Sequence, residues 1–211
     1  MLRRVAVPLI SLIVVIGLVV GVLVVFGGDD AEPAVEVAEI PAGTTYVTLD
    51  AGFVEALGQL GLTPGTVGPA VIKNGSARFP ITGGNVKYFT PGTEDPFVQG
   101  EINHNGSGLT LTAGDTEVAL VDFVVDPGES VLTGDVRVNG ELAKEDVELF
   151  FLDGRTLQPL RPIDDGAVLE GTTVTLKQGA AELLNETFGT DALAGGFTIG
   201  IAKIVVRTAV S

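Results

Sequence analysis

The chain has 211 residues, with 12 basic and 27 acidic side chains, no cysteine and no tryptophan. Its formal net charge of −15 argues against a nucleic-acid partner, because the phosphates would be repelled. The absence of cysteine excludes disulfides, thiolate metal sites and cysteine nucleophiles.

The first element that we expect in chain order is a transmembrane helix over residues 5–26. This segment of 22 residues carries no charge, and a helix of that length spans roughly 30 Å. Arg3 and Arg4 precede it, so we expect residues 1–4 in the cytoplasm and residues 29–211 outside it, on a single-pass cell-membrane anchor. The alternative is a cleaved signal peptide, whose apolar core usually runs only about 7–15 residues.

An acidic linker rich in Pro, Gly and Ala is predicted over residues 27–43, followed by one β-rich extracytoplasmic domain over residues 44–211. The domain should begin with a short strand at Tyr46–Leu49. Asp50 is then a suitable N-cap for a helix that ends at Leu60.

From Ala70 onward, short apolar runs alternate with turn-forming pairs, and this pattern predicts an antiparallel β-sandwich or barrel-like domain. The pairs include Asn74-Gly75, Gly83-Gly84, Asn105-Gly106, Gly114-Asp115, Pro127-Gly128, Asn139-Gly140 and Asp165-Gly166. A second short helix is predicted over Gln178–Phe188, and a closing strand over Phe197–Val206.

The two strand-to-helix passages resemble each other. Residues 47–57 and 174–184 share six identities in eleven positions, which fits either an internal repeat or a common strand-to-helix pattern. In both cases we expect the two helices in similar settings, each covering an edge or an open end of the sheet.

His104 is the one histidine, and it lies in a polar stretch rich in Gly and Asn over residues 100–108. It could contact a metal or haem or act as a general base, or it could be a loop histidine bonded to its own turn. Tyr46 and Tyr88 are the two tyrosines, and either could ligate haem iron or simply bury its ring in a strand.

Adjacent carboxylates leave a hydrolase open. Glu94-Asp95, Glu145-Asp146 and Asp164-Asp165 are pairs of the kind that glycoside hydrolysis uses, although an acidic chain produces such pairs by composition. The sequence has no EF-hand loop, so a calcium ion would need an irregular site in the Asp/Asn/Gly loops.

Three segments together resemble the HtaA domain family: Phe79–Gly84, Gly100–His104 and Gly106–Leu111. That family comprises extracytoplasmic, membrane- or wall-attached β-domains with short helices, and several members bind haem. The resemblance implies this fold and location for about Thr44–Val206.

The resemblance also implies a site, because haem-binding members use a tyrosine near the first helix and a supporting histidine. Here the first helix carries Phe53 and no tyrosine, Tyr46 precedes it, and His104 matches the loop histidine of the family.

We therefore expect a non-enzymatic binding module, anchored in the membrane, with haem held by Tyr46 and His104 as the ligand to test. A structural or adhesive envelope domain that binds a protein or polysaccharide is the second hypothesis. An extracellular glycan hydrolase is the third.

Overall fold

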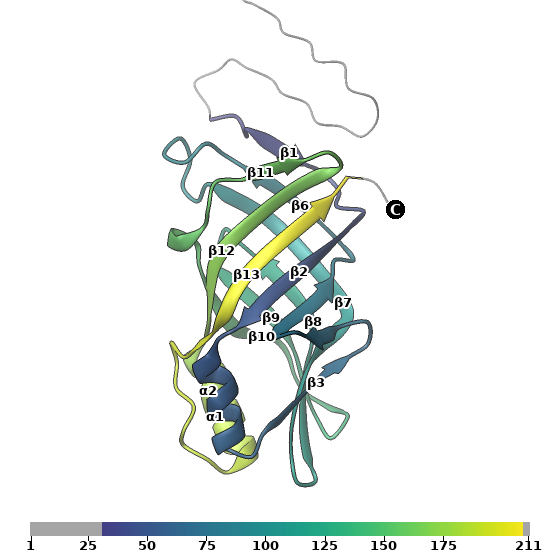
Figure 1. Cartoon of the computed structure of the whole chain (residues 1–211), viewed down its shortest axis with the longest axis vertical. Helices are drawn as coiled ribbons and strands as arrows, with labels where there is room; N and C mark the ends of the chain where they lie inside the picture. The colour runs from purple at the N-terminus through teal and green to yellow at the C-terminus, as the bar shows by residue number, and fades with distance from the viewer. Residues whose placement is uncertain (1–30, 209–211) are drawn as a thin grey trace, which may run out of the picture.

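The computed structural model describes residues 31–208 (Figure 1). These residues form one antiparallel sheet of 13 strands that curls into a half-barrel, with two α-helices at one end. The strands are β1 (Val35–Val37), β2 (Ala42–Leu49), β3 (Thr63–Val67), β4 (Val71–Lys73), β5 (Ser76–Pro80), β6 (Gly83–Tyr88), β7 (Val98–Ala113), β8 (Thr116–Asp126), β9 (Val131–Val138), β10 (Glu141–Asp153), β11 (Arg161–Ile163), β12 (Gly166–Leu176) and β13 (Thr198–Arg207).

The strand order is β1-β6-β7-β8-β9-β10-β12-β13-β2-β5-β4, while β3 pairs with β7 and β11 pairs with β12. The predicted antiparallel β-class is confirmed, but all strands belong to one curled sheet, so the two-sheet sandwich is not the fold. Thr82, in the connection between β5 and β6, contacts β7: its amide donates to the Asn103 carbonyl oxygen at 2.8 Å. This contact joins the segment after β5 to β7, which lies near the other end of the strand order.

Both predicted helices are present. Helix α1 (Ala51–Gln59) begins after Asp50, whose carboxylate accepts from the amides of Gly52 and Phe53 at 2.8 and 3.3 Å. Helix α2 (Gln178–Phe188) ends at Gly189, whose φ of 65° is the left-handed conformation that glycine adopts readily. No helix within residues 31–208 is long and apolar enough to cross a membrane, and the predicted helix over residues 5–26 lies outside the described residues.

The similar strand-to-helix passages occupy similar places. Strands β2 and β12 lie on either side of β13, and each leads into a helix at the same end of the sheet (Figure 1). The equivalent residues Leu57 and Leu184 are both buried and line the same small cavity between the helices and the sheet. The expectation that both helices cover an open end of the sheet is confirmed.

Several turn pairs do close hairpins. Asn74-Gly75 joins β4 to β5, and Asn139-Gly140 joins β9 to β10, with all four residues at positive φ. Asn105-Gly106 and Gly83-Gly84 do not form turns, and predicting them as turns was wrong. The first pair lies inside the 16-residue strand β7, and the second begins β6.

The reason for the first error is a β-bulge, which uses the same chemistry as a turn. Gly106 has a φ of 74°, and its amide donates to the Asp122 carboxylate at 2.7 Å across the β7–β8 pair. The register between these strands shifts between His104 and Gly108. The bulge bends β7, so that its first half pairs with β6 and its second half with β3.

The described part of the segment predicted as a linker, residues 31–43, contributes to the fold. Strand β1 pairs with β6, and Ile40 is 1% exposed in the core. Apolar residues in this short segment cover the edge of β6, which would otherwise present unpaired backbone groups. All strands and helices of the described residues lie within 35–207 around one hydrophobic core, so this part contains what a domain needs to fold on its own.

Candidate ligand cavity

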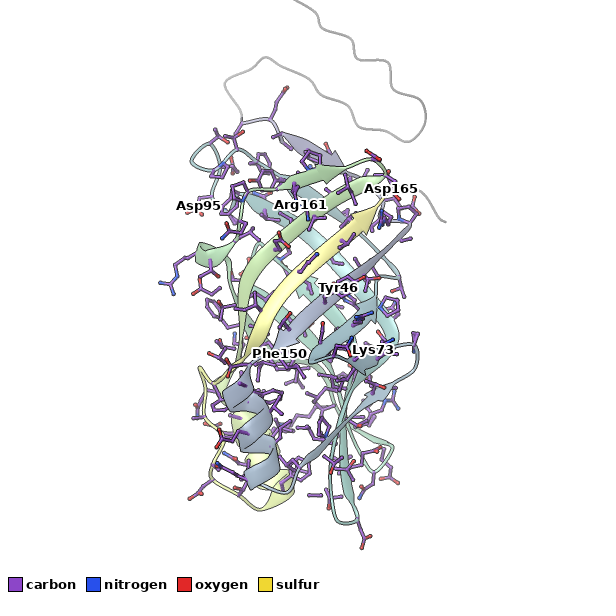
Figure 2. All side chains as sticks on the ribbon, in the orientation of Figure 1. Tyr46, Lys73, Asp95, Phe150, Arg161 and Asp165 are labelled. Carbon is purple, nitrogen blue, oxygen red and sulfur yellow. The ribbon has the colours of Figure 1, made fainter. Side chains whose placement is uncertain are left out.

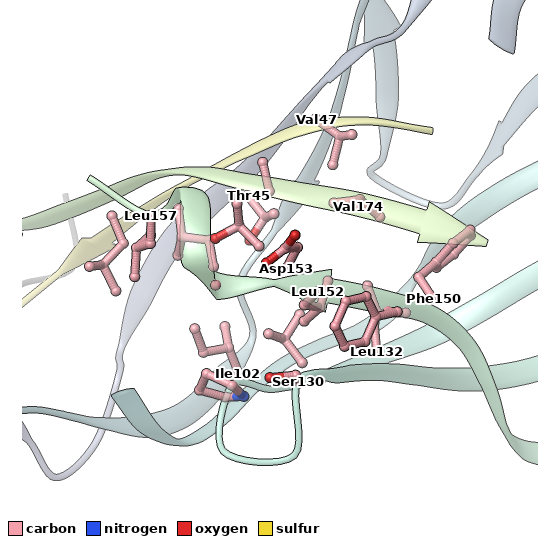
Figure 3. Close-up of a pocket in the computed structure, with 18 of the residues that line it drawn as sticks. Thr45, Val47, Ile102, Ser130, Leu132, Phe150, Leu152, Asp153, Leu157 and Val174 are labelled. Atoms are coloured by element: carbon pink, nitrogen blue, oxygen red, sulfur yellow. The ribbon is translucent and has the colours of Figure 1, made fainter. Parts of the chain in front are cut away.

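The curled sheet encloses an apolar cavity of about 330 Å³ (Figure 3). This volume falls within the range of small-molecule sites, roughly 300–1,000 Å³. The wall consists of inward-facing side chains from eight strands, which include Val47, Phe79, Ile102, Leu109, Phe123, Val125, Leu132, Phe150, Leu152, Leu169, Val174 and Ala202. Alternation produces most of this wall, because every second residue of a regular strand points inward. Strand β10 departs from it after a register shift and contributes the consecutive residues 150–153.

His104 lies in the wall of the cavity, on β7, and not in an exposed loop. Its ring is 1% exposed, with Nε2 2.8 Å from the Thr45 hydroxyl and Nδ1 3.3 Å from the Phe123 carbonyl oxygen. A carbonyl oxygen can only accept, so Nδ1 carries the proton and Nε2 accepts from Thr45. The histidine is therefore bonded to two other strands and not to its own turn.

Burial keeps this histidine neutral. Desolvation lowers the pKa of His104 from 6.5 to about 4, and the hydrogen bond to the Phe123 carbonyl opposes that shift only in part. At neutral pH the imidazole is thus an uncharged group with its Nε2 lone pair directed at Thr45.

Aromatic rings pack beside the histidine. Phe79 meets His104 edge to face at 6.3 Å between ring centroids, and Phe123 lies 5.4 Å from Phe79 and 6.4 Å from Phe150. Edge-to-face pairs at these distances are favourable beyond the area that they bury. They pack the cavity wall around His104 with aromatic rings.

Charged groups are also part of the lining: Asp95, Asp153 and Arg155. The Arg155 guanidinium lies 2.8 Å from the Asp153 carboxylate, and the amide of the same arginine also donates to that carboxylate at 3.0 Å. These bonds lower the pKa of Asp153 to about 2, so this carboxylate stays ionised at neutral pH. Of these three charged residues, only Asp95 belongs to one of the adjacent carboxylate pairs noted in the sequence, Glu94-Asp95.

Tyr46 lies on the other side of the sheet from His104. Thr45 faces the cavity, so its neighbour Tyr46 faces outward on β2 (Figure 2). The Arg78 guanidinium lies 5.5 Å from the centroid of the Tyr46 ring, and Lys203 pairs with Tyr46 across β13. The structure therefore does not bring the two predicted haem ligands together.

Tyr88 packs as a strand tyrosine. It is 7% exposed, its ring meets Phe97 at 6.0 Å, and its hydroxyl accepts from the Leu160 amide at 3.4 Å. Within residues 31–208 no group of three or more His, Asp or Glu side chains is placed to hold a metal ion.

Sequence reasoning missed Thr45, Asp153 and Arg155. Alternation next to Tyr46 could have placed Thr45 on the opposite face, since strand residues alternate. Asp153-Gly154 is a recognisable turn signal, and the structure has a 3-10 helix at Gly154–Thr156 there. Nothing local in the sequence indicates that this turn lies beside the same cavity as Thr45.

A second, smaller cavity of about 40 Å³ lies between the helices and the sheet. Its lining is almost wholly apolar and includes Phe53 and Leu57 from α1 and Leu184 from α2. Four residues line both cavities: Leu49, Leu109, Phe150 and Ile199.

No protein-family model and no curated protein matches the sequence. Among solved structures, the C-terminal domain of HtaA from Corynebacterium glutamicum matches with a TM-score of 0.57 and 13% identity, over 80% of this chain and 98% of that domain. The heme binding protein HtaB from the same organism matches with a TM-score of 0.48 and 10% identity, over 82% of this chain and 95% of HtaB. The resemblance to HtaA domains seen in the sequence is thus confirmed for the fold: the described part of the chain folds like the C-terminal domain of HtaA.

Proposed function

We propose that the chain is a non-enzymatic binding module that holds a small apolar molecule inside the curled sheet. The apolar cavity of about 330 Å³ carries this proposal. A sheet that served only as a scaffold would be expected to fill its interior, because protein cores normally pack with few voids larger than a water molecule.

The proposed location is the outer side of the cell membrane, with residues 5–26 as the anchor. The uncharged run of 22 residues, the preceding Arg3 and Arg4 and the acidic residues that follow support this proposal. Protease treatment of intact cells should degrade the domain if it lies outside, and protection in intact but not in lysed cells would contradict the proposal.

Haem is the first ligand to test. Because Tyr46 and His104 lie on opposite faces of the sheet, each of them defines a different place where haem could bind. Inside the cavity, Nδ1–H of His104 is held by the Phe123 carbonyl, as in many metal-binding histidines, and Nε2 could bind iron once Thr45 turns away. On the outer face, Tyr46 is flanked by Arg78 and Lys203, whose charges suit the carboxylates of haem.

A haem titration of residues 29–211, followed by absorbance, distinguishes the two places. A saturable Soret shift that His104→Gln abolishes and Tyr46→Phe preserves would place haem in the cavity, and the reverse would place it outside. Tyr88→Phe is the matched control, because Tyr88 is a packed strand tyrosine. No saturable shift at micromolar haem would contradict haem as the ligand.

The alternatives have less support. A structural or adhesive domain offers no reason for an apolar cavity of this size.

A glycan hydrolase gains one observation, because Asp95 and Asp153 line the same cavity. Asp153, ionised beside Arg155, would then act as the nucleophile or base of the pair. Loss of glycan hydrolysis in Asp95→Asn would support that activity, and absence of hydrolysis in the wild type would exclude it.

A further inference from the structure

The deeply buried polar groups of the cavity wall bond to protein partners. Among the lining residues, Thr45 and His104 are the buried polar side chains, and they bond to each other and to the Phe123 carbonyl. A ligand group that needed a hydrogen bond at this depth would have to break one of these bonds or stay unpaired, which is costly. The buried part of the ligand should therefore be a hydrocarbon without donors or acceptors.

The apolar space continues towards the helices. The 330 Å³ cavity and the 40 Å³ cavity share four lining residues, of which Phe150 is the largest. Phe150 packs against Phe123 and is 6% exposed, so its ring forms part of the wall between the two spaces. Two apolar spaces in series favour an elongated hydrocarbon over a compact one.

The charges of the lining disfavour an anionic head group. Asp153 and Arg155 neutralise each other in an ion pair, which leaves Asp95 as a further negative charge. The domain as a whole is strongly acidic, because ten basic residues follow residue 26 against 27 acidic ones. A carboxylate head group would meet this negative field, whereas a hydroxyl or ammonium group would not.

We propose that the cavity takes a single-chain amphiphile whose head group is uncharged or cationic, such as a long-chain alcohol or amine. The inference rests on the proposed function, the binding of a small molecule in this cavity. The chain lies among the apolar side chains of the sheet, the head group lies near Asp95, and Phe150 limits the chain length.

The first experiment compares head groups of one chain length. Dodecan-1-ol, dodecylamine, dodecanoate and haem are titrated into residues 29–211 by calorimetry, each below its aggregation concentration. We expect one site, with the alcohol and the amine bound at least about threefold more tightly than the carboxylate, as one unfavourable charge contact would cause. Asp95→Asn should reduce that ratio, whereas Glu94→Gln, a neighbouring charge outside the lining, should leave it unchanged.

The second experiment tests the length limit. Phe150→Ala joins the two spaces and should move the best-bound alcohol to a chain longer by about two or more carbons, since each buried methylene adds affinity. Leu149→Ala is the matched control, because Leu149 is 1% exposed on the same strand but lines neither cavity. An unchanged length preference in Phe150→Ala, measured in a variant that still melts cooperatively, would overturn the length limit.

The outcomes separate this inference from the proposed function. Binding of haem without binding of any aliphatic chain would overturn the inference. If His104→Gln abolishes that haem binding and Tyr46→Phe preserves it, the cavity-binding module stays intact, whereas the reverse would count against both. Equal or tighter binding of dodecanoate would overturn the proposed head-group preference. Binding of none of the four ligands would count against both the inference and the proposed function.

Discussion

The two faces of strand β2 have opposite character. On the inner face, Thr45 is 6% exposed and donates to a neutral histidine among phenylalanine rings. On the outer face, the adjacent Tyr46 lies between Arg78 and Lys203. One step along the chain thus separates an apolar interior from a charged surface.

This difference shows why two residues that together indicate a site in the sequence need not share one. A strand turns successive side chains to opposite faces, so Tyr46 can reach the cavity only if the strand shifts its register by one residue. Such a shift would turn every inward side chain of β2 outward, and the eight-residue pairing with β13 opposes it.

The largest expected effect is on the inner face. Phe123→Ala removes a ring that packs on Phe79 and Phe150 and should lower the free energy of unfolding by about 3–5 kcal/mol. Ile201→Ala, on a side chain that is 44% exposed and lines neither cavity, should cost well under half of that. Chemical denaturation measures both, and equal losses would contradict the assignment of the two faces.

His104 should make stability depend on pH. The pKa of His104 is about 4 in the folded protein against 6.5 when unfolded, so the unfolded chain takes up the proton first as the pH falls. The stabilising contribution is complete above about pH 6.5 and is lost as the pH falls to about 4, by about 3 kcal/mol in all.

Many carboxylates titrate in the same range, so the measurement is a difference between two proteins. Denaturation of wild type and His104→Gln is followed from pH 7 to pH 4, and the wild type should lose about 3 kcal/mol more than the variant. Parallel curves would show that His104 is solvated in the folded state.

The hydroxyl of Thr45 should matter more than that of Tyr46. Thr45→Val leaves Nε2 of His104 without its donor and should cost about 1–3 kcal/mol, because a buried acceptor is left unpaired. Tyr46→Phe keeps the ring under Arg78 and should change stability by less than about 0.5 kcal/mol. Thermal melts of both variants test the comparison, and a reversed order would place Tyr46 in the interior.

Local signals in the sequence predicted much of the fold. The ends of α2 follow from the apolar spacing before Gly189, and the start of α1 follows from the capping carboxylate of Asp50. Asn139-Gly140 indicated a hairpin, and the structure has one. These features depend on residues close together in the chain, so physical rules for short segments apply to them.

The same rules were wrong at Asn105-Gly106, because a glycine at positive φ serves a bulge as well as a turn. The partner that decides between them is Asp122, which accepts from the Gly106 amide across the sheet. His104 therefore belongs to a buried strand, although its polar neighbours are typical of a loop.

By itself, the sequence determined the acidic character of the domain, the absence of thiol chemistry, the β-class and the positions of both helices, because composition and short-range spacing suffice for these. The tertiary structure alone decided that Thr45, His104 and Phe123 meet, that Tyr46 faces away from them, and that an apolar cavity lies among eight strands. These properties depend on the register of strands far apart in the chain and on the curl of the sheet, which no local pattern specifies.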